Sequence, residues 1–189
     1  MLGLRRMGLL LALGLALSAG CAPTVKSFLH PDVDLGYVRR VALLPFSNLS
    51  GDEFADERIT SLFVTRLLSA NVVEVVEAGA VREAMTRMNV SAGMTLSPEQ
   101  IVALGKALAV DALFGGTVEE YGPVREHRET QNQVTASFTL SETQSGTLVW
   151  RAEVHEGGGS FWRRLFGLGG RSLHDVSADA VDRALGTLF

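Results

Sequence analysis

Few residues in this sequence have the types and spacing that catalysis or metal binding requires. The histidines are His30, His127, His155 and His174. A zinc-hydrolase helix needs two histidines four residues apart with a glutamate between them, and the sequence has no such pair. No serine lies in a Gly-x-Ser-x-Gly elbow, and Gly105-Lys106 lacks the remaining residues of a phosphate-binding loop. Glu119 and Glu120 could act in acid–base catalysis, but we expect them to be solvated at a strand edge. The sequence therefore predicts no catalytic residues, no metal site and no cofactor.

The single cysteine is the residue with a defined chemistry. Two arginines precede an apolar run over residues 7–17, and small residues lead up to Cys21, which is the pattern of a secretory signal. The run is shorter than the ~20 apolar residues that a membrane-spanning helix needs. Residues 17–21 resemble the lipobox of bacterial lipoproteins, which implies a signal peptide over residues 1–20, cleaved before Cys21, and acyl chains on that cysteine. The alternative is an ordinary secretory signal with a chance cysteine at its end.

The residues after the cysteine predict where the protein stays. In the sorting signals that this segment resembles, aspartate after the cysteine favours the inner membrane, so Ala22 favours the outer membrane. Residues 22–36 contain two prolines and a glycine with little periodicity, and we interpret residues 21–36 as the lipidated cysteine and a tether. Fully extended, such a tether reaches roughly 50 Å. We therefore expect a lipid anchor in the outer membrane, with the protein on its periplasmic face.

Composition limits the remaining classes of function. The chain has 189 residues, of which 47% are hydrophobic, and this is enough for one domain with a packed core. The net charge of −4 lacks the basic excess of a nucleic-acid-binding protein, so we expect no nucleic-acid partner. A single cysteine excludes an intrachain disulfide and a multi-cysteine zinc site.

The domain expected over residues 37–189 alternates strands with helices. Apolar runs and alternation predict strands at 38–46, 72–76, 111–121, 134–140 and 147–154. Apolar stripes and caps predict helices that begin after Ser50 and Ser97, a short helix at 80–88 and a terminal helix beyond 170. Gly115 and Gly116 predict a bulge or a close backbone approach, and the charge run 125–129 predicts a solvated loop between strands. The fold class is α/β (α+β): a single domain with a mixed β-sheet, helices packed on it, a C-terminal hairpin and a terminal helix.

Two segments resemble a known family. The runs VALLPFSN (41–48) and LGKALAVDALFGGTV (104–118) resemble segments of the CsgG-like envelope lipoproteins, whose relatives include the LpoB-type activators of cell-wall synthases and the TolB amino-terminal domain. The resemblance covers residues 37–122 and, more weakly, the hairpin to residue 156. It implies a small α/β domain with a binding or assembly role and no catalytic residues. The hairpin 134–154 has the face pattern of an ordinary sheet, unlike the membrane hairpins of a CsgG channel.

One further segment has the composition of a contact surface. Between two glycine stretches lie Phe161, Trp162, Arg163, Arg164, Leu165 and Phe166. Aromatic residues and arginine are enriched at the centres of protein interfaces, and they also suit a membrane surface, where rings lie at headgroup level. We predict that these residues contact a partner or the membrane. The alternative is that they fold back onto the core of their own domain.

The leading hypothesis is a non-enzymatic, lipid-anchored periplasmic accessory or assembly lipoprotein that binds another envelope protein. An alternative is a ring-forming component of an outer-membrane secretion system, which the CsgG-like resemblance implies and which would form a homo-oligomer. A third is a hydrolase whose site is formed only in the fold. A deep pocket with converging titratable groups would support that third hypothesis.

Overall fold

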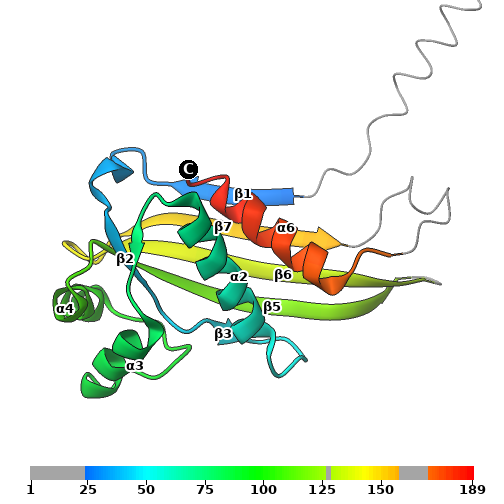
Figure 1. Ribbon diagram of the computed structural model, residues 1–189, viewed down its shortest axis with the longest axis horizontal. Helices are drawn as coiled ribbons and strands as arrows, with labels where there is room; N and C mark the ends of the chain where they lie inside the picture. Colours follow the sequence, from blue (N-terminus) through cyan, green and yellow to red (C-terminus); the bar gives the residue numbers. More distant parts are fainter. Residues whose placement is uncertain (1–23, 127–128, 158–169) are drawn as a thin grey trace, which may run out of the picture.

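A computed structural model describes residues 24–126, 129–157 and 170–189 (Figure 1). In these ranges the strands are β1 (Thr24–Leu29), β2 (Arg40–Leu43), β3 (Ser47–Asn48), β4 (Glu74–Val75), β5 (Ala112–Glu126), β6 (Glu129–Glu142) and β7 (Leu148–Gly157). The helices are the 3-10 turn η1 (Leu35–Tyr37) and α2 (Ala55–Ala70), α3 (Ala78–Arg87), α4 (Pro98–Leu108) and α6 (Leu173–Leu185). The predicted signal peptide lies outside the described residues. Within them, no helix has the length and apolar character to cross a bilayer.

The strands form one mixed sheet in the order β1-β7-β6-β5-β2-β4, and β3 pairs with β5 farther along that strand. The neighbours β5, β6, β7 and β1 are antiparallel, whereas β2 runs parallel to both β4 and β5. Parallel neighbours need crossover connections, and α2, α3 and α4 lie in them. The predicted single α/β domain, with a mixed sheet and helices packed on it, is confirmed.

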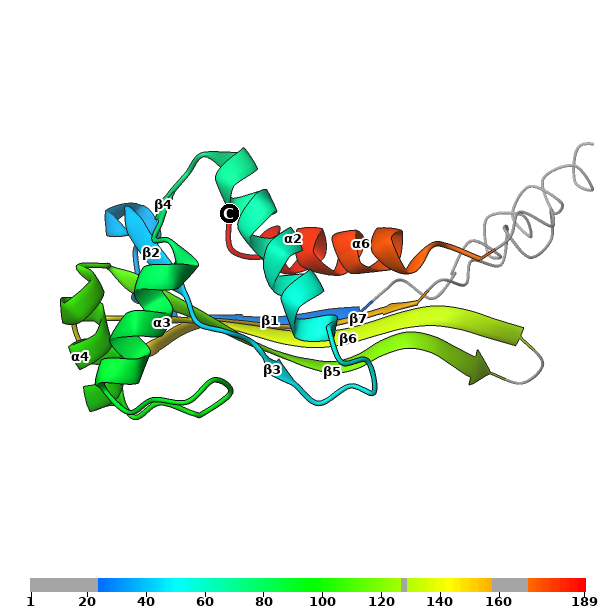
Figure 2. The ribbon, with the colours of Figure 1, turned by 60° about the horizontal axis from the view of Figure 1, so that its bottom comes forward.

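The helices cover different parts of the two sheet faces (Figure 2). α2 and α6 pack on one face over the antiparallel strands, around a core that includes Phe63, Trp150 and Val181. α3 and α4 pack on the opposite face only near the start of β2 and β5, around Ala42 and Leu113. Along the rest of β5, β6 and β7, that opposite face carries no helix from the described part of the chain. These strands therefore have one apolar and one accessible polar face.

An aromatic cluster holds α2 on the sheet. Phe63 of α2 stacks on Phe138 with the ring centroids 5.0 Å apart, and it meets Phe46 and Phe114 edge-on at 5.7 and 5.2 Å. Phe114 also meets Trp150 edge-on at 6.2 Å. All five rings are buried. Because aromatic pairs contribute ~0.5–1.5 kcal/mol beyond the burial of their area, the cluster fixes how α2 crosses the strands.

The tether predicted over residues 22–36 is wrong for most of its length. Thr24–Leu29 forms β1, which pairs antiparallel with β7 from end to end. Residues 35–37 form η1, whose first turn is capped by Asp34 Oδ1, which accepts a hydrogen bond from Gly36 N at 2.8 Å. Residues 24–29 do not alternate between apolar and polar, because an edge strand depends on its single neighbour rather than on burial of one face. The folded domain therefore includes residues 24–29 and 35–37.

The first predicted strand is shorter than expected. The run 38–46 forms a strand only over Arg40–Leu43, and Pro45 separates it from the short β3. The close backbone approach expected at the glycine pair is confirmed at Gly116, where a Cβ would lie 3.0 Å from the ring of Phe46. The absence of a side chain at Gly116 therefore leaves room for the ring of Phe46 in the aromatic cluster.

The hairpin formed by β5 and β6 is longer than expected. β5 continues to Glu126 and β6 begins at Glu129, so residues 125, 126 and 129 of the charge run belong to the paired strands of one long hairpin, and His127 and Arg128 lie outside the described residues. The predicted hairpin between β6 and β7 is confirmed. The outer part of β5 and β6 has polar residues on both faces, which removes the alternation that sequence analysis detects.

α4 packs closely against the turn between β6 and β7. It begins with the predicted capping box, in which Ser97 Oγ accepts from Gln100 N at 3.3 Å and Gln100 Oε1 accepts from Ser97 N at 2.9 Å. On its buried face, Gly105 lies so near Thr143 that a Cβ would approach the Thr143 Cβ to 2.2 Å. Thr143 is fixed in turn, because its Oγ1 donates to the carbonyl oxygen of Val110 at 2.6 Å.

We expect Gly105→Ala to lower the free energy of unfolding by about 2 kcal/mol or more, because overpacking a tight contact costs ~1–3 kcal/mol. Gly79→Ala is the matched control, since Gly79 lies in the first turn of α3 with open space at its Cβ position. The higher helix propensity of alanine should leave the stability of that variant equal or raise it by up to ~1 kcal/mol. Urea unfolding measures both, and equal effects would contradict the close packing of α4.

Candidate functional site

The uncovered face of β5, β6 and β7 is the floor of a groove of ≈ 800 Å³. The segment between α3 and α4 lines one side, and the residues after β3 line another. The floor is formed by small or polar residues, namely Gly115, Thr117, Glu119, Ser137, Thr139, Ser141 and Arg151. Three apolar side chains on the lining, Leu49, Met94 and Leu148, are 72%, 45% and 39% exposed. The groove thus combines a polar floor with accessible apolar side chains, as protein-binding surfaces do.

A β-bulge brings two glutamates onto this face. The register between β5 and β6 shifts between Val118 and Glu120, so Glu119 is the extra residue. Glu120 accepts hydrogen bonds from Thr135 Oγ1 at 2.7 Å and from Gln133 Nε2 at 2.5 Å. These hydrogen bonds, that from Thr135 first, hold the pKa of the Glu120 carboxyl below its usual value. Glu120 is therefore a carboxylate at neutral pH.

Thr135 extends this network to β7. Its Oγ1 lies 2.9 Å from Nδ1 of His155, and because the hydroxyl hydrogen points to Glu120, the histidine must be the donor. An activated nucleophile needs a base that takes its proton and a third group that orients the base. Here the hydroxyl lies between the carboxylate and the imidazole at an exposed position. The arrangement therefore offers hydrogen-bonding groups to a bound molecule and no activated hydroxyl. In the described ranges, no group of three His, Cys, Asp or Glu side chains could hold a metal ion.

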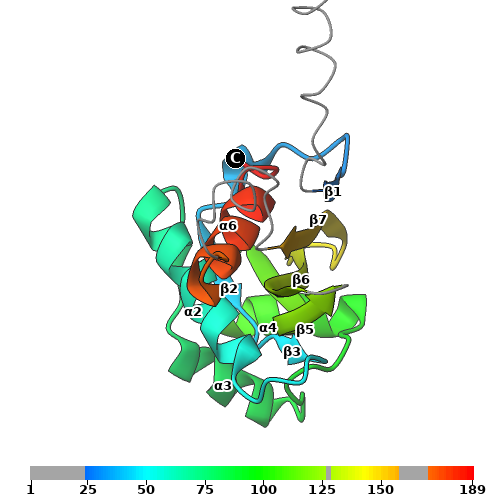
Figure 3. The same cartoon turned by 90° about the vertical axis from the view of Figure 1, so that its right-hand side faces the viewer.

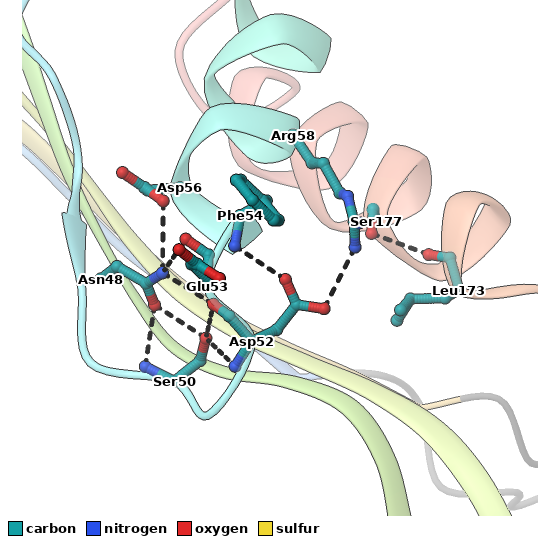
Figure 4. A network of polar contacts seen from close by, with 9 residues as sticks. All are labelled: Asn48, Ser50, Asp52, Glu53, Phe54, Asp56, Arg58, Leu173 and Ser177. Carbon is teal, nitrogen blue, oxygen red and sulfur yellow. Dashed lines mark hydrogen bonds and ion pairs between the residues drawn. The ribbon is translucent and has the colours of Figure 1, made fainter.

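Asn48 fixes the loop that carries Leu49 (Figure 4). Its Nδ2 donates to the carbonyl oxygen of Asp52 at 2.8 Å and to Asp56 Oδ1 at 3.2 Å. Its Oδ1 accepts from the backbone N and the Oγ of Ser50 at 3.0 and 2.7 Å. The exposed Leu49 is thus presented by a loop with several fixed points, so little conformational entropy is lost when a partner covers it.

The start of α2 joins the same network. Asp52 accepts from Phe54 N at 2.9 Å and forms an ion pair with Arg58 at 3.1 Å, and the Arg58 guanidinium lies 5.9 Å from the ring centre of Tyr121 on β5. The capping box predicted from Ser50 is absent, because the helix begins later and its N-cap, Phe54, makes no side-chain cap bond. The Asp52 carboxylate instead accepts a hydrogen bond at the start of α2, from the backbone N of Phe54.

A buried ionic network joins the end of β7 to α6. Glu156, which is 2% exposed, forms ion pairs with Arg171 at 3.7 Å and with Arg183. Arg171 also pairs with Asp179 at 2.5 Å, and its carbonyl oxygen accepts from Asn132 Nδ2 at 2.8 Å. Burial raises the pKa of the Glu156 carboxyl, although both arginines oppose this effect. The network holds the residues on either side of segment 158–169 close together.

Of the residues that sequence analysis singled out, Gly115 and Glu119 lie on the groove floor, but the predicted lipidation and contact residues do not lie in the described groove. Cys21 and the six residues 161–166 lie outside the described part of the chain. Sequence analysis missed the groove, although the alternation over 134–140 had indicated an accessible face that contains Thr135 and Thr139. Nothing in the sequence showed that Leu49, Met94 and Arg151 would line one groove, because the strand order decides it.

Comparison with known proteins connects the chain to one family. The family model of the peptidoglycan-synthase activator LpoB matches residues 18–155. This finding supports the LpoB-type part of the expected resemblance, and the CsgG-like part has no support. No curated protein matches the chain.

Solved structures share the fold. The PelC dodecamer from Paraburkholderia phytofirmans is similar with a TM-score of 0.58 at 18% identity, over 88% of this chain and 97% of that chain. The hypothetical protein CT253 from Chlamydia trachomatis has a TM-score of 0.55 at 11% identity, over 80% and 95% of the two chains. Lipoprotein GNA1162 from Neisseria meningitidis has a TM-score of 0.51 at 21% identity, over 69% and 91%. At these identities the likeness establishes the fold alone.

The raised pKa of Glu156 predicts a specific dependence of stability on pH. The folded state binds this proton more tightly than the unfolded state, so the stabilisation is present below the usual pKa of 4.5 and is lost as the pH rises through the folded value. Glutamine at this position stays neutral. The stability of the wild type relative to Glu156→Gln should therefore fall as the pH rises from 4.5 to neutrality.

Urea unfolding at a series of pH values measures this difference. Glu153→Gln, at an exposed position on the same strand, is the control and should show no such trend. A wild type that gains stability relative to Glu156→Gln over the same interval would mean that the two arginines outweigh burial.

Proposed function

The chain belongs to the LpoB family of peptidoglycan-synthase activators, and from this we propose that it is a lipid-anchored accessory lipoprotein that binds and activates a peptidoglycan synthase. The observation that carries the proposal is the family match over residues 18–155, which includes most of the described sheet and α2, α3 and α4. The groove on the uncovered sheet face supports a binding role, because accessible apolar side chains lie beside its polar floor. Elsewhere on that sheet face, the Thr135 hydroxyl is hydrogen-bonded to Glu120 and His155 and is not activated as a nucleophile.

We propose that Cys21 carries the lipid anchor and that the protein lies on the periplasmic face of the outer membrane. The small residues before the only cysteine support acylation, and the family match begins within that segment, at residue 18. Alanine after the cysteine supports the outer membrane as the destination. Several acyl chains together hold a protein on a bilayer firmly, because each buried CH₂ contributes ~0.8 kcal/mol.

Two surfaces are candidates for contact with the synthase. The first is the groove, where Leu49 and Met94 flank the polar floor. The second is the segment that contains Phe161, Trp162, Arg163, Arg164, Leu165 and Phe166, which we predicted from its composition. We propose that the groove binds the synthase and that the aromatic segment adds contacts to the same partner or to the membrane.

The ring-forming secretion component is not favoured, because the matched family is described as synthase activators. Self-association is compatible with an accessory role, since one structural neighbour is described as a dodecamer. Light scattering of the purified protein measures its oligomeric state.

In-cell photo-crosslinking tests the function. A photoreactive amino acid replaces Thr139 on the groove floor, Trp162 in the aromatic segment, or Glu83 on the exposed side of α3 as the control. We expect mass spectrometry to identify a peptidoglycan synthase in the products from position 139, and none in those from position 83. Products that contain only further copies of this chain, or no synthase from positions 139 and 162, would overturn the proposal.

Paired variants separate the two surfaces. Leu49→Ser combined with Met94→Ser should weaken binding to the captured synthase at least ~10-fold, because the loss of apolar anchors costs more than ~1.4 kcal/mol. Leu68→Ser is the control, since Leu68 is 56% exposed but lies on α2, outside the groove. Alanine at positions 162, 163 and 164 should leave cooperative thermal unfolding intact if the aromatic segment makes external contacts, and should abolish it if the segment belongs to the core.

A further inference from the structure

β1 is an edge strand with accessible apolar side chains. It is the last strand in the sheet order, so the outward N–H and C=O groups of its backbone have no strand partner among the described residues. Phe28 and Leu29 are 47% and 45% exposed, and Lys26 is exposed beside them. Proteins normally shorten, charge or cover such edges, because a free edge pairs with other chains. We therefore expect that something covers the β1 edge in the cell.

The sequence places the proposed lipid anchor next to this strand. Only Ala22 and Pro23 separate Cys21 from Thr24, the first residue of β1. Three residue steps span at most about 11 Å, even in a fully extended chain. An acylated Cys21 would therefore hold the start of β1 within about 11 Å of the bilayer surface.

The length of the β5–β6 hairpin limits how the domain can stand on that surface. Thr24 pairs with His155, which pairs with Thr135, so these residues mark one level across the sheet. β6 extends from Thr135 back to Glu129, about 20 Å beyond this level at ~3.3 Å per residue. β5 and β6 can be followed past the start of β1 in Figure 1.

A domain anchored with its strands perpendicular to the bilayer would push this hairpin into the lipid. The projection of about 20 Å exceeds the reach of about 11 Å, so the end of the hairpin would have to enter the membrane. The described residues there include Arg125, Thr130 and Asn132, whose charged and polar side chains oppose burial in hydrocarbon. The strands must therefore lie along the surface, or nearly so.

We propose that the β1 edge, residues 24–29, lies against the surface of the bilayer, with the strands running along the membrane. The inference rests on the proposed acylation of Cys21. Viewed along the strands, β1 forms the upper end of the sheet and β7, β6 and β5 follow it downward (Figure 3). With β1 on the lipid, the sheet stands on its edge, and the groove on β5–β7 faces sideways into the periplasm.

The chemistry of β1 suits the interfacial region of a bilayer. Phe28 and Leu29 project to opposite sides of the strand, so each can lie at the boundary between headgroups and acyl chains. The long stem of Lys26 can pack along the strand while its ammonium group remains among lipid phosphates. Unpaired backbone N–H groups can donate to phosphate and ester oxygens. The lipid surface thus covers the edge that would otherwise pair with another chain.

Depth-dependent quenching tests this orientation on the full-length protein in vesicles of phosphatidylethanolamine and phosphatidylglycerol. A fluorescent amino acid replaces Ser27 on β1, Thr130 near the end of the hairpin, or Glu83 on α3, and lipids with a nitroxide on the headgroup act as quenchers. We expect the strongest quenching at position 27, less at 130 and almost none at 83. Stronger quenching at position 130 than at 27 would overturn the proposal, because it would mean that the hairpin points into the membrane.

Substitutions show whether the apolar side chains make the contact. Phe28→Ser combined with Leu29→Ser should lower the quenching at position 27 towards that at position 83. The matched control is Leu68→Ser with Val72→Ser, because these side chains are 56% and 44% exposed and lie away from β1. If the double variant does not fold, Phe28→Ser alone gives the same readout. Unchanged quenching in a folded variant would overturn the proposal.

The mass of the purified protein shows whether Cys21 is acylated, so it tests the proposed anchor separately from the proposed orientation. If Cys21 is not acylated, the proposed anchor fails, and coupling the single thiol to a maleimide lipid still places the same link on the bilayer. Equal quenching at positions 27 and 83 after coupling would overturn the orientation itself. So would an amine crosslink that joins Lys26 of two copies in the vesicles, because a second copy of the chain would then cover β1.

Discussion

The packing of Phe63 among the aromatic side chains of the sheet is the contact on which the rest of the fold depends. α2 is the crossover that makes β2 and β4 parallel, and Phe63 couples it to Phe114 of β5 and Phe138 of β6. Because side chains alternate along a strand, a core face fixed at Phe138 places Ser137 and Thr139 on the opposite face. A shift by one residue would exchange the two faces. The polar groove is therefore a consequence of the register that the aromatic cluster imposes.

Two irregular features of the sheet lie at the groove, in addition to the register shift between Leu140 and Ser141 in the pairing of β6 with β7. A bulge at Glu119 interrupts the pairing of β5 with β6, and the loop after β3 departs from the direction of the strand to present Leu49. Side-chain hydrogen bonds from Thr135 and Asn48 satisfy the polar groups at these two places. Bulges and fixed loops alter the direction of side chains without disturbing the core on the other face. Departures from regular structure that are concentrated on one face indicate that this face has a role beyond stability.

The parts of the fold that local pattern determines could be predicted from the sequence. The alternation around Phe138 gave a half-buried strand, and Ser97 with Gln100 gave the start of α4. β1 could not be predicted, because its residues do not alternate and it is held by the free edge of β7. The groove could not be predicted either. Its residues are far apart in the sequence, and only the order of the strands brings Leu49, Met94 and Arg151 to one surface.

The position of β1 also changes what the proposed lipid anchor would allow. A free tether of residues 22–36 would have let the domain reach roughly 50 Å from the membrane, but a domain that includes Thr24 would remain within about 11 Å of an acylated Cys21. Strands lie ~4.8 Å apart, so the groove on β5–β7 would remain within a few strand widths of the bilayer. If a synthase binds there as proposed, it must itself extend to the outer membrane. In the proposed arrangement, the accessory protein would supply a fixed binding surface beside the membrane, and the partner would supply the reach across the periplasm.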